Sequence, residues 1–258
     1  MISRRDFLKI SGLLGLGTLG FPDWFTPFFV YHGDRNSKKI ALTFDDGWDE
    51  ESVEQVIQIL NWYDINCSFF IVGQMLDDYP ALWRYALDSG HRIYNHTETH
   101  RQILNADDAI VEYQILAWEE SYLNLERGYP YRLIRLPGLR GMGELEVENK
   151  LLELGYKAAV GGSVNSEDYY WHLDSEINAE KVLGNVVSNL RGGDIIVCHF
   201  LPSTIRALSR IIEGGRNFGY EFVELRRLPG VPFFDYWGEG NSNKLFKKLW
   251  RAEDGPLR

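Results

Sequence analysis

From residue 39 onward, short apolar runs alternate with longer stretches in which apolar residues recur at helical spacing. The apolar runs predict strands at residues 40–44, 67–72, 91–94, 133–135, 157–160, 194–198 and 221–225. The stretches between them predict helices at residues 53–60, 107–125, 144–154, 177–190 and 204–212. This alternation favours parallel strands joined by helical crossovers over a sandwich or a helical bundle. We therefore expect an α/β fold, a distorted barrel of about seven parallel strands.

Titratable side chains follow several of the predicted strands directly. They are Asp45 and Asp46 after the first strand, His96 and His100 after the third, Arg135 at the end of the fourth and His199 after the sixth. Parallel α/β barrels carry their active sites at the carboxyl ends of the strands. We therefore expect these side chains to meet at one end of the barrel. His32, His91 and His172 have no such companions, and we interpret them as structural.

The composition is that of an ordinary globular protein of 258 residues, with 45% hydrophobic and 25% charged residues. One domain is the economical interpretation. The formal net charge of -10 argues against a nucleic-acid partner, because such binding depends on Lys and Arg facing phosphates. A neutral or cationic ligand fits this charge better.

Two cysteines, Cys67 and Cys198, lie inside apolar runs of strand type. Buried thiols with a structural role are the simpler interpretation. A disulfide outside the cytosol is the alternative, and it requires neighbouring strands with suitable geometry, which the spacing leaves open.

The N-terminus carries Ser3-Arg4-Arg5 followed by Phe7-Leu8-Lys9 and a glycine-rich apolar run, residues 10–21, that is too short to span a bilayer. This segment resembles a twin-arginine export signal. It predicts export to the periplasm, the cell envelope or the medium. No Ala-x-Ala cleavage site is present, so removal and retention as an anchor stay open, and a retained segment can make peripheral membrane contact.

The chemistry of the strand-end residues indicates a metal-assisted hydrolase. An aspartate doublet and a His-x-x-x-His can bind one divalent ion and leave one carboxylate free as a base. Each element has an ordinary explanation when taken alone. Two surface or core histidines can explain the spacing, and Asp-Asp-Gly after a strand is common in turns.

Taken together, residues 39–225 resemble the NodB-type polysaccharide deacetylases, carbohydrate esterase family 4. The segments that carry the resemblance are Thr43-Phe44-Asp45-Asp46-Gly47, the strand at 68–73, Asn95-His96-Thr97 with His100, Arg135-Leu136-Pro137-Gly138 and Val197-Cys198-His199. The sequence departs from the family pattern at Tyr94, where Gly is common. It departs again after Pro137, where an aromatic residue is missing.

The resemblance implies a NodB-like barrel and one divalent ion held by Asp46, His96 and His100. Zinc is the default from the ligand types, with cobalt and nickel as alternatives. It also implies that the Thr97 hydroxyl supports the loop, and that a backbone N–H near Gly138 binds the oxyanion.

The resemblance further implies Asp45 as catalytic base, oriented by Arg135, and His199 as general acid. The family's fourth motif fits two registers, one beginning at Val164 and one at Asp168. Both registers retain Asp168, so we assign it the orienting role.

The implied function is hydrolysis of acetyl groups from N-acetylated sugars of a polysaccharide or glycan by a monomer. O-acetyl cleavage on xylan and a non-catalytic carbohydrate-binding protein on the same fold stay open as alternatives. A non-haem iron oxygenase also uses two His and one carboxylate, but it would not require Asp45 and His199.

The domain assignment is 1–30 for the signal or anchor, 31–235 for the deacetylase domain and 236–258 for the C-terminal tail. In the tail, Leu245, Phe246, Leu249 and Trp250 predict a short amphipathic helix.

Overall fold

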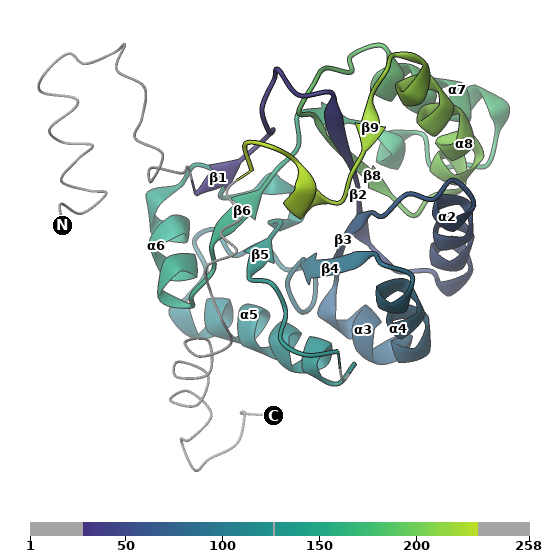
Figure 1. Cartoon of the computed structure of the whole chain (residues 1–258). Coiled ribbons are helices and arrows are strands. Elements are labelled where there is room, and N and C mark those ends of the chain that lie inside the picture. The colour runs from purple at the N-terminus through teal and green to yellow at the C-terminus, as the bar shows by residue number, and fades with distance from the viewer. Residues whose placement is uncertain (1–27, 126, 232–258) are drawn as a thin grey trace, which may run out of the picture.

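The computed structural model describes residues 28–125 and 127–231 of the chain (Figure 1). The predicted export motif and the predicted tail helix lie outside these residues. Residues 29 and 30, which the sequence interpretation placed in the N-terminal segment, lie in a strand of the domain.

The described strands form one nine-stranded sheet. The strands are β1 (Phe29–Val30), β2 (Lys39–Asp46), β3 (Ser68–Ile71), β4 (Arg92–Asn95), β5 (Leu133–Ile134), β6 (Ala158–Val160), β7 (Val164–Asn165), β8 (Ile195–His199) and β9 (Glu221–Phe222). Their order is β1-β6-β5-β4-β3-β2-β8-β7, and β9 pairs with the start of β2. Each pair of strands is parallel, as the sequence pattern predicted.

Helices surround the outside of the curved sheet (Figure 1). They are α2 (Glu50–Trp62), α3 (Gly73–Asp78), α4 (Pro80–Asp88), α5 (Asp108–Leu123), α6 (Leu145–Glu153), α7 (Glu176–Val187) and α8 (Pro202–Asn217). Short 3-10 turns occupy Pro137–Leu139, Asp168–Tyr170 and Leu225–Arg227. The expected NodB-like distorted barrel is confirmed in this open form, in which β1 and β7 are the two ends of the strand order.

Helix α2 shows how local sequence sets an element. The Asp49 carboxylate accepts a hydrogen bond from the Ser52 backbone N–H at 2.8 Å and caps the helix. The negative charge of Glu50 interacts favourably with the positive end of the helix dipole. Val53, Val56, Ile57 and Leu60 recur at the predicted spacing and are buried. Burying each such side chain contributes about 1.5–3 kcal/mol.

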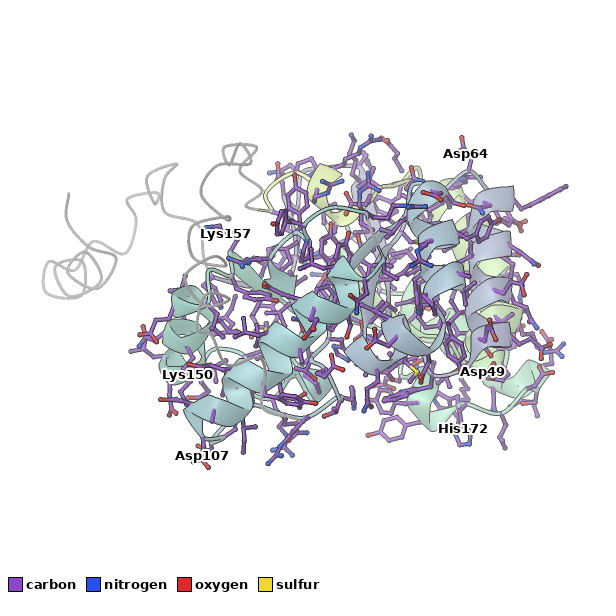
Figure 2. All side chains as sticks on the ribbon, turned by 90° about the horizontal axis from the view of Figure 1, so that it is seen from below. Asp49, Asp64, Asp107, Lys150, Lys157 and His172 are labelled. Carbon is purple, nitrogen blue, oxygen red and sulfur yellow. The ribbon has the colours of Figure 1, made fainter. Side chains whose placement is uncertain are left out.

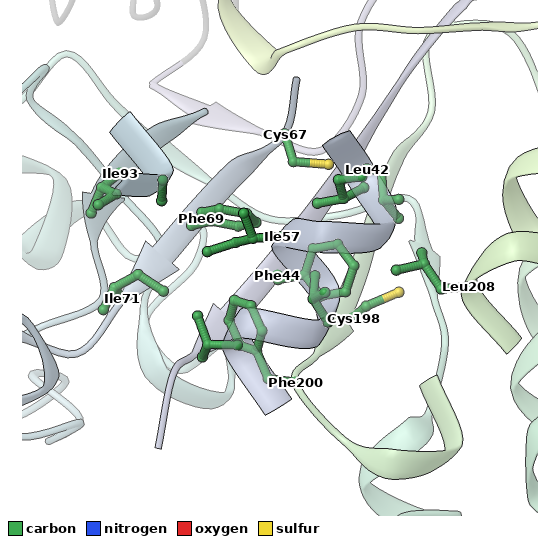
Figure 3. Packing of buried hydrophobic residues seen from close by; sticks show 14 of the residues in the cluster. Leu42, Phe44, Ile57, Cys67, Phe69, Ile71, Ile93, Cys198, Phe200 and Leu208 are labelled. Atoms are coloured by element: carbon green, nitrogen blue, oxygen red, sulfur yellow. The ribbon is translucent and has the colours of Figure 1, made fainter. Parts of the chain in front are cut away.

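The two faces of β2 serve different purposes because successive side chains of a strand alternate. Leu42 and Phe44 face the helices and pack with Ile57 of α2 and Leu208 of α8 (Figure 3). Ala41, by contrast, belongs to a separate apolar cluster inside the barrel. The side chains of β2 that lie on the same face as Ala41 therefore point into the barrel interior.

Cys67 and Cys198 lie in the apolar cluster between sheet and helices, and both are free thiols (Figure 3). Cys198 belongs to β8 and Cys67 immediately precedes β3, and these strands flank β2 on opposite sides. Burial raises the pKa of both thiols well above the usual value. The structural interpretation of the cysteines is therefore correct for the protein described here, and the disulfide alternative is not realised.

The structure corrects several predicted elements. The strand predicted at 221–225 ends after Phe222, and Leu225 already starts a 3-10 turn. Strands β1 and β7 were not predicted, since a two-residue strand is defined by its partner and not by its own sequence. Helices α3 and α4 were also missed.

The carboxyl ends of the strands lie on one side of the molecule. Asp49 and Asp107 precede α2 and α5, and they lie with His172 toward the lower edge of Figure 2. Asp64 and Lys157 lie toward the upper edge. His91 is buried and has a structural role in the interior, whereas His172 and His32 are exposed.

His91 should make stability depend on pH. Its Nδ1 accepts from the Cys67 backbone N–H at 3.1 Å, and burial together with the neighbouring Arg92 lowers the pKa of His91 to about 4. An unfolded histidine titrates near 6.5. The unfolded state therefore binds the extra proton between pH 6.5 and about 4, and the free energy of unfolding should fall as the pH falls through this window.

We expect His91→Gln to flatten this slope in urea unfolding measured between pH 4 and 7, even though the variant is less stable overall. The site histidines are common to both proteins, so the difference in slope reports His91 alone. An equal slope in both proteins would contradict the assignment.

Candidate active site

The structure brings the predicted site residues together at the carboxyl ends of the strands. Asp45 and His199 are direct partners in the pairing of β2 with β8. Asn95, the last residue of β4, pairs with Ile71 on one side and Ile134 on the other. This register brings the ends of β2, β4, β5 and β8, and the residues that follow them, to one edge of the sheet.

Asp45 is held by a buried arginine. It is 4% exposed, and its Oδ1 accepts from Nη1 of Arg135 at 2.5 Å. The same Nη1 donates to the Thr43 hydroxyl at 2.8 Å. Because one carboxylate oxygen of Asp45 is occupied by the guanidinium, the other oxygen is the one left to accept a proton.

Arg135 is completely buried, and its other two nitrogens also donate hydrogen bonds. Nε donates to the carbonyl of Val160 at 3.1 Å, and Nη2 donates to the carbonyl of Gly161 at 2.9 Å. The guanidinium carbon lies 4.1 Å from the centre of the Phe70 ring. A buried charge is tolerated when it is paired and hydrogen-bonded, and Arg135 is paired with Asp45 and has an acceptor at each of its three nitrogens.

Asp46 and two histidines form the one group in the described residues with the geometry of a metal site. Oδ1 of Asp46 lies 3.3 Å from Nε2 of His96 and 3.2 Å from Nε2 of His100. Nδ1 of His96 lies 2.9 Å from the carbonyl oxygen of Arg135 and donates to it. Nε2 of a neutral His96 therefore has a free lone pair directed at Asp46.

The site fits a cation. Asp46 Oδ1 is buried and has no hydrogen-bond donor among the described residues, although an unpaired buried carboxylate oxygen is costly. Burial by itself raises the pKa of Asp46, but His96, His199 and His100 outweigh it and lower the pKa to about 2. One carboxylate and two imidazoles leave an open coordination position, as catalytic zinc sites do.

Unusual backbone conformations direct these ligands. Asp46, Thr97 and His100 have φ values of 80°, 66° and 59°, in the left-handed region that non-glycine residues seldom adopt. Such residues cluster at functional sites because the surrounding structure must hold them there. The Thr97 hydroxyl has no partner among the described residues, so the expectation that it supports the loop is wrong.

His199 is oriented by Asp168. Nδ1 of His199 donates to Oδ1 of Asp168 at 2.7 Å, and Oδ2 of Asp168 accepts from the His199 backbone N–H and the Thr204 hydroxyl, both at 2.6 Å. Burial alone lowers the pKa of His199, but Asp168, Asp45 and Asp46 together raise it to about 9. His199 is therefore protonated at neutral pH in this arrangement.

Two exposed aromatic rings lie beside the histidines of the site. Trp48 meets His100 edge-on at a centroid distance of 5.9 Å, and Tyr169 meets His199 in the same manner at 5.9 Å. The rings are 47% and 44% exposed and are therefore available to a ligand. Gly138, near the missing aromatic residue, is exposed with φ 59°.

Three supporting residues were not found from the sequence. Thr43 sits within the recognised motif, but only the structure shows its bond to Arg135. Thr204 lies in α8 with no local signal. The backbone carbonyl of Gln114 in α5 accepts from the Glu98 N–H, and its side-chain oxygen accepts from the Thr99 N–H. Gln114 therefore holds the segment between the two histidines.

Comparison with known proteins agrees with the fold and shows the family. The family model for polysaccharide deacetylases matches residues 32–159. A peptidoglycan-N-acetylglucosamine deacetylase of Bacillus cereus is 30% identical over 211 residues, which cover 79% of this chain and 93% of that protein. A solved peptidoglycan N-acetylglucosamine deacetylase superposes with a TM-score of 0.70 at 27% identity, over 81% of this chain and 99% of that one.

A wild-type pseudoenzyme of carbohydrate esterase family 4 from Bacillus anthracis superposes with a TM-score of 0.72 at 20% identity, over 82% of this chain and 72% of that one. That likeness concerns the fold alone.

An open parallel α/β barrel with a carboxylate, an imidazole and a candidate cation site at its strand ends is the arrangement expected of a metal-assisted hydrolase. The chain belongs to the NodB-type polysaccharide deacetylases, carbohydrate esterase family 4. The predicted enzyme class, a polysaccharide deacetylase that removes acetyl groups from N-acetylated sugars, is thereby confirmed. In the described part of the chain, no helix combines the length and the apolar character that crossing a bilayer needs.

Proposed function

We propose that this deacetylase acts outside the cytoplasm on an N-acetylated glycan of the cell envelope, with Asp45 as base and His199 as acid. The observation that carries the proposal is the pairing of Asp45 with His199 across β2 and β8, each held by its own buried partner. A base and an acid on adjacent strands can act on the same acetyl group from two sides.

Asp45 takes the proton of the attacking water. Its Oδ1 is engaged by Arg135, which leaves Oδ2 as the acceptor. Thr43 accepts from the same guanidinium and donates to the Ile196 carbonyl at 2.6 Å, so the base is fixed from β2, from β8 and from the residue that follows β5. Fixed orientation of a general base lowers the barrier without a reorganisation cost.

His199 delivers the proton to the leaving nitrogen. Asp168 occupies Nδ1, so Nε2 is the atom that faces the reaction. An amine leaves poorly unless it is protonated, whereas an ester oxygen needs the proton less. A proton held by His199 at neutral pH therefore matters more for amide cleavage than for the O-acetyl alternative.

Asp46, His96 and His100 are the residues that would hold one divalent ion. Zinc suits one carboxylate and two imidazoles, and cobalt or nickel would also fit. When bound, such an ion supplies a Lewis acid that polarises the acetyl carbonyl and lowers the pKa of water. The proposed backbone N–H near Gly138 would add a second stabilising interaction for the oxyanion.

Trp48 and Tyr169 are proposed to flank the glycan. Their exposed rings lie on the His100 side and the His199 side of the site. An aromatic ring offers an apolar face to the C–H groups of a sugar and leaves its hydroxyls to water. Similarity to a peptidoglycan-N-acetylglucosamine deacetylase supports a cell-wall glycan as substrate. That the protein acts as a monomer stays a prediction from the sequence.

The test of the base is Asp45→Asn. The amide keeps the shape of the side chain but cannot accept the water's proton, so acetate release from peptidoglycan fragments and chitin oligomers should fall by about a thousandfold or more. Elemental analysis after zinc reconstitution should still give one ion per chain in this variant.

His96→Ala is the matched control, and it should lose the ion together with the activity. Rates near wild type in Asp45→Asn would refute the base role, and unchanged zinc in His96→Ala would refute the metal site. Acetylxylan in the same assay distinguishes amide from ester preference.

A second prediction concerns the alkaline limb of the pH profile. His199 must be protonated to act as acid, so kcat/KM should fall as the pH rises through the pKa of His199, which the carboxylates raise to about 9. Asp168→Asn removes the carboxylate that bonds Nδ1, so the limb should move to lower pH by about one unit or more.

Thr204→Val is the control for this experiment, because it removes one bond to Asp168 and leaves the carboxylate in place. Its alkaline limb should stay near that of the wild type. A limb unmoved in Asp168→Asn would show that His199 is not the group that titrates there.

A third prediction concerns export. Ser3-Arg4-Arg5 with Phe7-Leu8-Lys9 supports a folded-protein export route to the periplasm or cell envelope. Replacing Arg4 and Arg5 with lysine keeps the charge but should retain the protein in the cytoplasm of a host with this pathway, measured by cell fractionation. Replacing Lys9 with arginine is the control and should leave export intact. Export of the double lysine variant would contradict the proposal.

A further inference from the structure

A chain of buried polar contacts leads to the turn between the two histidines of the cation site. Its first member is Asn95, the last residue of β4, which is completely buried. Oδ1 of Asn95 accepts from the Thr97 backbone N–H at 2.6 Å, and Nδ2 donates to the Tyr156 hydroxyl at 2.6 Å. The Asn95 carbonyl accepts from the Arg135 backbone N–H at 3.0 Å.

The contacts continue away from the site and have a defined direction. The Tyr156 hydroxyl accepts from Asn95, which leaves its own proton available to the Glu119 carboxylate, whose pKa the Tyr156 hydroxyl lowers. Glu119 lies in α5 and accepts two bonds at 3.0 Å from the Arg132 guanidinium. Tyr156 and Glu119 are each 1% exposed. Because the Asn95 amide nitrogen donates to the Tyr156 hydroxyl, the side-chain oxygen of Asn95 faces the Thr97 backbone N–H.

Thr97 needs this support because its conformation is unfavourable. Its φ of 66° is rare for a β-branched residue and costs about 1–3 kcal/mol. Its hydroxyl makes no compensating bond among the described residues. The turn is held instead by its backbone, through Asn95 and through the bond from the Gly73 N–H to the Thr97 carbonyl at 3.0 Å.

We propose that Tyr156 and Asn95 are positioning residues that hold the Thr97 turn and thereby direct His96 and His100 at Asp46. The inference rests on the proposed metal site. Asn95 contacts the site through two routes, since its side chain fixes the turn after His96 and its carbonyl fixes Arg135, whose own carbonyl bonds His96. Polar groups that orient metal ligands commonly change metal affinity by 10–100-fold when removed.

The experiment is Co²⁺ titration of the full chain, followed by visible absorption and by competition with a chelator. Tyr156→Phe removes one hydroxyl and leaves Asn95 Nδ2 without its acceptor. The apparent Kd for Co²⁺ should rise about tenfold, and the cobalt absorption bands should shift as the ligand geometry loosens.

Tyr94→Phe is the matched control. Tyr94 is the neighbour of Asn95, is equally buried and also bonds a buried carboxylate, that of Glu224 at 2.5 Å. Tyr94→Phe likewise removes one tyrosine hydroxyl. Tyr94, however, packs in the barrel-interior cluster and makes no bond to the Thr97 turn. Its Co²⁺ affinity should stay within about twofold of wild type and its spectrum should not change.

Rescue provides the second measurement. Glycine adopts positive φ without strain, so Thr97→Gly added to Tyr156→Phe should recover most of the lost affinity. Glu119→Gln, which weakens the acceptor of the Tyr156 proton, should raise the Kd in the same direction and keeps the test decisive if Tyr156→Phe does not fold.

The outcomes separate this inference from the proposed function. Wild-type protein that binds no Co²⁺ would count against the metal site itself. Wild-type binding with equal affinity and spectra in Tyr156→Phe and Glu119→Gln would overturn the positioning role and leave the metal site standing. Equal losses in Tyr156→Phe and Tyr94→Phe would also overturn it, because a general loss of stability would then explain both.

Discussion

The buried ion pair between Arg135 and Asp45 is the constraint on which the site depends. A guanidinium with no exposure to water is stable only if its charge is paired and its nitrogens find acceptors. Arg135 finds them on β2, at Asp45 and Thr43, and at the Val160 and Gly161 carbonyls. Its own carbonyl accepts from His96. One residue therefore fixes the base, the strand ends around it and the tautomer of a candidate metal ligand.

Parallel pairing explains why residues so distant in the sequence meet. In a parallel sheet, equivalent ends of neighbouring strands lie at one edge, and register then decides which residues face each other. Here Asp45 pairs with His199 across β2 and β8. The left-handed conformations at Asp46 and Thr97 turn the chain sharply after β2 and β4, so the residues beyond the strands stay beside the site. Strain at these positions is compatible with stability because buried bonds determine them.

Much of this arrangement could be predicted, because strands buried on both faces read as continuous apolar runs and the residues after them lie at one edge. The predicted strands and site residues follow that rule. The features that could not be predicted depend on partners that are distant in the sequence. The pairings of β1 and β7, the bond from Thr204 to Asp168 and the support of Thr97 by Asn95 leave no local pattern. The Thr97 hydroxyl was assigned a role from a motif, whereas its burial without a partner is visible only in three dimensions.

The aspartate doublet shows how neighbouring identical residues acquire different chemistry. Successive side chains of a strand point to opposite faces, and Asp45 points into the barrel toward Arg135. Asp46 would point away, but its φ of 80° at the end of β2 turns its carboxylate toward His96 and His100. One carboxylate is therefore neutralised by a permanent cation and keeps an oxygen for a proton. The other faces two imidazoles and suits a metal ion. The difference lies in backbone geometry and neighbours, since the side chains are the same.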